Sequence, residues 1–147
     1  MTSFEPVRVL VITDRTDDRP ELLEVIRTRA EQGPVSLRLL VTNPARTEFH
    51  FFHPERHEAV WEAQRSLLHL LDTVQIYAGH YPVQGAVSIR HDALEAVEED
   101  LARVPADELI VAVACSELSR RLHHDLPHRL ERLHLPMTVV GALAGAH

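Results

Sequence analysis

A histidine-rich segment is the first candidate for metal chemistry in this sequence. In FHFFHPERHEAVW the imidazoles of His50, His53 and His57 recur at intervals of three or four residues, and His91 is a further candidate from elsewhere in the chain. Neutral imidazoles gathered in this way ligate zinc and other transition metals. The alternative is that the aromatic side chains of the segment pack inward while the histidines cap helices and form hydrogen bonds. No cysteine or H-x-x-x-H helix motif accompanies the segment, so packing is favoured over metal binding.

The single cysteine is a candidate for thiol chemistry. Cys115 follows an apolar run and precedes Arg120 and Arg121. A helix start and nearby cations lower the pKa of a thiol and make it reactive. A lone cysteine is more often a small buried apolar residue, and the sequence identifies no general base for it. Ser116 is interpreted as a helix N-cap, because no G-x-S-x-G motif surrounds it.

Five short apolar runs predict the strands that position these residues. They are rich in Val, Ile and Leu, as expected of strands covered on both faces, and they span residues 7–13, 36–42, 85–90, 108–114 and 137–141. Amphipathic helical patterns separate them at residues 20–33, 57–71 and 92–104. The last pattern opens with Asp92 and Glu95 in capping-box spacing. The alternation predicts an α/β fold with one open parallel sheet and helices on both faces.

In such a sheet, ligands bind outside the carboxyl ends of the strands. This rule selects residues that directly follow the predicted strands, together with the two arginines downstream of the fourth strand. The resulting ligand-binding candidates are Asp14, His91, Cys115, Ser116, Arg120 and Arg121.

Composition narrows the classes of partner. The 147 residues predict one domain, with residues 142–147 as a terminal tail, and the formal charge of -7 disfavours a nucleic-acid partner. No apolar run approaches the roughly 18 residues of a membrane span, and the start of the chain lacks the pattern of a secretory signal. One cysteine fits a reducing compartment, so a cytoplasmic location is expected.

Three stretches resemble the universal stress protein family: VRVLVITD, SIRHDALEAVEEDLARVPADELIVAV and LPMTVVG. The resemblance covers nearly the whole chain except residues 43–58. It implies a Rossmann-like, five-stranded sheet in the order 3-2-1-4-5 and a homodimer that pairs through the last strand. An apolar edge strand leaves backbone groups unpaired unless a partner covers them. The expected interface residues are Met137, Thr138, Val139 and Val140.

The resemblance also shows which family motif the chain lacks. The ATP-binding branch has a glycine after the fourth strand, another three residues on, and a later Gly-Ser or Gly-Thr pair, which let backbone N–H groups approach phosphates. Here Val113 stands at the first glycine and His123–His124 at the late pair. Only Asp14 matches, at a position where the family often has a nucleotide-contacting aspartate.

Asp125 is expected to replace a phosphate at the following helix. It precedes Leu126 and Pro127, so its carboxylate is predicted to accept the free N–H groups at the helix start and to repel an anion. ATP is therefore not expected to bind in the family's usual way, and no cofactor is predicted. The arginines at 120, 121 and 129 leave open an improvised anion site, against the alternative of a solvated, charge-balanced helical face.

Two functional classes follow. The favoured one is a noncatalytic, universal-stress-like homodimer that binds an unknown small molecule or regulates a partner. The alternative is a small enzyme or metal protein that uses the histidine-rich 50–57 loop, Asp14 and Cys115. Enzymatic activity is left open, with the noncatalytic class preferred because no acid–base or nucleophile pair is recognisable.

Overall fold

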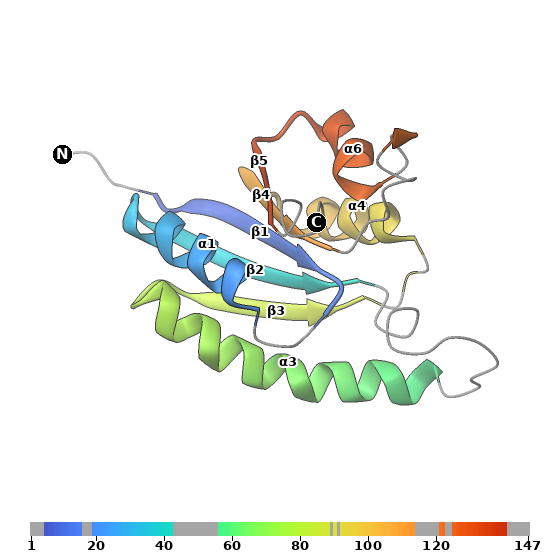
Figure 1. Ribbon diagram of the computed structural model, residues 1–147, viewed down its shortest axis with the longest axis horizontal. Helices are drawn as coiled ribbons and strands as arrows, with labels where there is room; N and C mark the ends of the chain where they lie inside the picture. Colours follow the sequence, from blue (N-terminus) through green and yellow to red (C-terminus); the bar gives the residue numbers. More distant parts are fainter. Residues whose placement is uncertain are drawn as a thin grey trace.

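The computed structural model describes residues 5–15, 19–42, 56–88, 90, 92–113, 121–122 and 125–140, and of residues 56–63 the backbone alone. Five parallel strands form one open sheet in the order β3-β2-β1-β4-β5, which confirms the predicted architecture and strand order. The strands are β1 (Val7–Thr13), β2 (Val35–Val41), β3 (Val83–Val87), β4 (Glu108–Ala112) and β5 (Met137–Val139). Strands β3 and β5 form the two edges (Figure 1).

Strand ends differ from the apolar runs by up to three residues, because pairing with a neighbour decides where a strand stops. The register of β4 against β1 ends at Thr13↔Ala112, so the apolar residues after Ala112 do not extend β4. The register of β3 against β2 likewise ends at Val41↔Val87, which shortens β3 relative to the predicted run.

Four helices accompany the sheet: α1 (Pro20–Glu31), α3 (Arg56–Ala78), α4 (Ala93–Arg103) and the short α6 (Leu126–Leu130), which continues into a 3-10 turn at Glu131–Leu133. None of the helices in the described part of the chain is both long and apolar enough to cross a membrane.

Local sequence explains where α4 and α3 begin or end. Asp92 caps α4, since its Oδ2 accepts a hydrogen bond from the Glu95 backbone N–H at 3.2 Å, which confirms the predicted cap. Helix α3 runs past the predicted end to Ala78 and stops at Gly79, whose φ of 72° is readily adopted by glycine. The Gln75 amide closes this turn by donating to the carbonyls of Gly79 and Tyr81, each at 2.7 Å.

The core has two layers because successive strand residues point to opposite faces. Val9 and Val11 of β1 pack in the layer that contains α1 and α3, whereas Leu10 and Ile12 pack in the layer that contains α4 and α6. All four side chains are buried, which confirms that β1 is covered on both faces (Figure 1).

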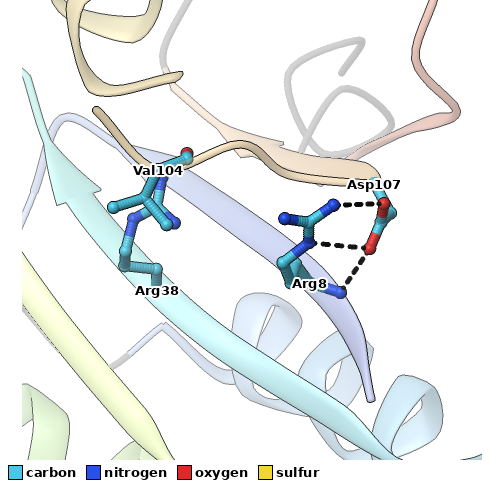
Figure 2. A network of polar contacts seen from close by, with 4 residues as sticks. All are labelled: Arg8, Arg38, Val104 and Asp107. Carbon is cyan, nitrogen blue, oxygen red and sulfur yellow. Dashed lines mark hydrogen bonds and ion pairs between the residues drawn. The ribbon is translucent and has the colours of Figure 1, made fainter. Parts of the chain in front are cut away.

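Two arginines on neighbouring strands hold the second layer in register. Arg8 of β1 donates to Asp107 from its backbone N–H at 2.9 Å and from its guanidinium at 3.2 and 3.1 Å (Figure 2). These hydrogen bonds lower the pKa of Asp107 below its usual value. On β2, Arg38 pairs with the buried Asp100 of α4 and donates to the Val104 carbonyl at 2.8 Å.

Gly85 lets α3 lie close to β3. A Cβ atom at this position would lie 3.0 Å from Leu71 Cδ2 and 3.2 Å from Leu67 Cδ1, which is tighter than ordinary van der Waals contact. Gly85→Val should therefore lower the free energy of unfolding by about 1–3 kcal/mol through overpacking. Urea denaturation of the variant measures this loss.

The neighbouring Gln84→Val is the matched control. Its side chain points to the opposite face of β3 and is exposed, so the same β-branched residue should fit there. Equal stability of the two variants would show that α3 does not depend on the small residue at 85.

Candidate functional site: the carboxyl edge of the sheet

The carboxyl ends of the parallel strands bring four sequence-distant residues to one edge. Asp14 follows β1, Thr42 follows β2, Ser88 follows β3 and Val113 follows β4. The chain leaves β1 toward β2 on one side, and β4 lies on the other side. The crevice between the ends of β1 and β4 is thus the topological switch point, where open α/β sheets bind ligands.

Arg19 spans this crevice. It occupies the N-cap position of α1, and its Nη1 donates to the Ala112 carbonyl at the end of β4 at 3.2 Å. Its side chain makes no capping hydrogen bond, and Pro20 occupies the first turn. The helix start therefore has amide N–H groups without a side-chain acceptor from the N-cap residue, beside a cationic guanidinium, which favours an anion.

Two buried threonines line the floor of the edge. Thr13 is fully buried, and its hydroxyl donates to the Arg15 carbonyl at 3.1 Å and accepts from the Arg15 N–H at 3.2 Å, which fixes the turn after β1. Thr42 is 1% exposed, and its backbone N–H donates to the Thr13 carbonyl at 2.8 Å. The Thr42 hydroxyl has no hydrogen-bond partner among the described residues. A buried polar group in this state costs roughly 1–3 kcal/mol, which a ligand that bonds to it would offset.

Asp92 and Arg129 serve structure at the rim. Besides capping α4, the Asp92 carboxylate accepts two hydrogen bonds from the Arg129 guanidinium, at 2.8 and 2.9 Å. These hydrogen bonds raise the pKa of Arg129 and tie α6 to the start of α4. Arg129 is therefore engaged by a carboxylate, which corrects the expectation that it contributes to an improvised anion site.

Asp125 does not cap α6 with its carboxylate, so this prediction was wrong. It is the N-cap residue, yet its side chain makes no capping hydrogen bond, and its Oδ1 instead lies 2.5 Å from His128 Nδ1. The reason is local: Pro127 stands at the second helical position and has no N–H to donate. The buried carboxylate turns to the imidazole ring instead.

Comparison with known proteins identifies the fold. No family model and no curated protein sequence matches the chain. Among solved structures, the universal stress protein from Archaeoglobus fulgidus is 12% identical with a TM-score of 0.61, and covers 91% of this chain and 93% of its own. The chain has the universal stress protein fold.

Two further structures with this fold hold nucleotides. The universal stress protein from Archaeoglobus fulgidus in complex with dAMP is 12% identical with a TM-score of 0.60, over 91% of this chain and 97% of that one. A universal stress protein in complex with cAMP is 15% identical with a TM-score of 0.54, over 92% and 98%. The resemblance inferred from three stretches of sequence is thus confirmed at the level of fold.

Most candidate residues fall outside the described part of the universal stress protein fold. These are His50, His53, His91, Cys115, Ser116 and Arg120, together with the side chain of His57, whose backbone lies in the first turn of α3. Within the described residues, no group of three or more His, Cys, Asp or Glu side chains could hold a metal ion. The histidine-rich metal site and the reactive thiol stay predictions.

Two of the ligand-binding candidates are described. Asp14 is half-buried directly after β1, where the sheet rule placed it, and Arg121 is exposed ahead of α6. Sequence reasoning missed Arg19 and Thr42. The available signal for Arg19 was an arginine before Pro20, at an N-cap position where Ser, Thr, Asp or Asn is usual.

Proposed function

We propose that this protein is a noncatalytic binding module of the universal stress type that takes a nucleotide with a single phosphate at the crevice between β1 and β4. Occupancy of the crevice is its regulatory signal. Arg19 is the observation that carries the proposal, because it places a guanidinium across the switch point at the start of α1. Membership of the family and a cytoplasmic location are parts of the same proposal.

The phosphate is assigned to Arg19 and the start of α1. One guanidinium N–H bonds to the Ala112 carbonyl, which anchors the side chain and leaves other N–H groups for phosphate oxygens. The backbone amides and the dipole of α1 add a favourable interaction with negative charge. Asp14 and the buried Thr42 hydroxyl then lie at the same edge to bind the sugar or base.

A single phosphate is favoured over three for two reasons. The residues after β4 lack the glycines that let backbone amides follow a triphosphate in the ATP-binding branch of the family. The named nucleotides of the two neighbours, dAMP and cAMP, also carry one phosphate each. We therefore infer that ATP gains nothing from its extra phosphates here.

Calorimetric titration with AMP and ATP tests this proposal. Arg19→Gln should raise the dissociation constant for AMP by roughly tenfold or more, since a charge-assisted hydrogen bond to the phosphate is lost. ATP should bind the unaltered protein no more tightly than AMP.

Arg27→Gln is the charge-matched control on the same helix. Arg27 lies over the Tyr77 ring, 5.0 Å from its centroid, in the middle of α1 and away from the crevice. It should bind AMP like the unaltered protein. Absence of AMP binding, or equal binding by the Arg19 variant, would overturn the assigned site.

The homodimer through the last strand is a further part of the proposal. β5 is an edge strand of three residues, and both Thr138 and Val139 are exposed. Val140 lies beyond the strand and is buried in the first core layer, so its side chain is not available to a partner. The interface is accordingly assigned to Met137–Val139.

A further inference from the structure

A groove lies on the other half of the molecule from the carboxyl edge. It is bounded by the second half of α1 and by β4 and β5, and its volume is about 310 Å³. Glu108 begins β4 and Arg29 lies in the last turn of α1, so the groove sits near the amino ends of the strands. Its size is at the lower end of the range, about 300–1,000 Å³, of sites that hold small molecules.

The topology explains why this face of β4 and β5 is open. Right-handed crossovers from β1 to β2 and from β2 to β3 place α1 and α3 on the same face as the groove, beside the strands that they connect. Beyond α1, no described helix covers Ile110 and Thr138. Val25 and Ile110 consequently form an apolar lining, with hydroxyls from Thr28 and Thr138.

An ion pair gives the groove a specific polar edge. Arg29 Nε lies 2.9 Å from Glu108 Oε1, and Arg29 Nη2 lies 2.8 Å from Glu108 Oε2, with side chains 16% and 28% exposed. The pair uses two of the five guanidinium N–H groups, and the others have no acceptor among the described residues. The carboxylate oxygens also keep lone pairs for further donors.

These groups define the chemistry of an occupant. The charges of Arg29 and Glu108 cancel, so an anion would be repelled by Glu108 and a cation by Arg29 while either lost its hydration. A neutral group that offers an acceptor and a donor side by side matches the free guanidinium N–H groups and the carboxylate lone pairs together. We propose that the groove is a second ligand site, for a neutral small molecule with a flat apolar body and an amide edge.

Three probes that share a benzene ring test the assignment: benzamide, benzoate and benzylamine, which is protonated at neutral pH. In two-dimensional ¹⁵N–¹H NMR titrations, benzamide should shift the backbone amides of Val25, Arg29, Ile110 and Thr138. Benzoate and benzylamine should bind roughly tenfold more weakly, because each brings an uncompensated charge.

Thr28→Trp should abolish these shifts, because the indole fills the groove from an exposed position of α1. Gln64→Trp, at an exposed position of α3, is the control that should bind like the unaltered protein. Equal binding of the three probes, no shift with benzamide, or shifts confined to Thr13, Thr42 and Ser88 would each overturn the proposal. The mapping on the unaltered protein decides the matter even if Thr28→Trp fails to fold, and AMP binding plays no part in it.

Discussion

Asp100→Ala should lower the free energy of unfolding by about 3 kcal/mol, because it leaves a guanidinium buried without its counter-charge. Asp100 is 7% exposed and accepts from Arg38 Nε at 3.1 Å and from Arg38 Nη2. Arg38 lies in the middle of β2, so it cannot reach solvent without disturbing the central sheet. Urea denaturation followed by circular dichroism measures the loss.

Two comparisons separate the pair from a general effect on α4. Glu99→Ala makes the same change one residue away, where the carboxylate forms an exposed pair with Arg90, and stability should hardly change. The double change Arg38→Met with Asp100→Leu should recover most of the loss, because apolar replacements of a buried pair are often neutral. A loss below about 1 kcal/mol for Asp100→Ala would mean that the pair contributes no more than a surface one.

Val139→Pro should convert the proposed homodimer into monomers. The Val140 N–H donates to Val111 and the Pro136 carbonyl accepts from Leu109, so both face β4. Backbone groups alternate in direction along a strand, and those of Val139 therefore face the open edge. Proline there removes an edge N–H from each copy, and the dimer dissociation constant should rise about 100-fold or more in sedimentation experiments.

Val139→Thr is the matched control, since it keeps the N–H group and the β-branched shape and should remain dimeric. The fold of the proline variant should persist, because the Val139 N–H makes no bond to β4. Unaltered protein that sediments as a monomer, or a proline variant that dimerises normally, would exclude pairing through β5.

Much of the fold could be predicted from local pattern. The continuous apolar character of residues 7–13 identified β1 with its bounds, and Asp92 with Glu95 identified the start of α4. Both signals are local, since burial on two faces and helix capping depend on neighbouring residues. Strand ends were less accurate, because the length of β3 and β4 depends on the partner strand.

The site was less predictable than the fold. The sheet rule placed Asp14 at the carboxyl edge, yet neither Arg19 nor Thr42 belongs to a motif that marks it in sequence. Asp125 shows the converse case, in which a cap inferred from three residues failed because Pro127 lacks an N–H and His128 offers a ring nitrogen instead.

The sequence by itself determined the α/β class, the five strands and most helix starts, because periodicity and capping are properties of short segments. Only the tertiary structure decided the pairing of Arg38 with Asp100, 62 residues apart, and of Arg19 with the Ala112 carbonyl, 93 residues apart. It also decided that the α1–β4–β5 face stays open. Such contacts depend on which strands become neighbours, and that order is set by crossovers and packing of the whole chain.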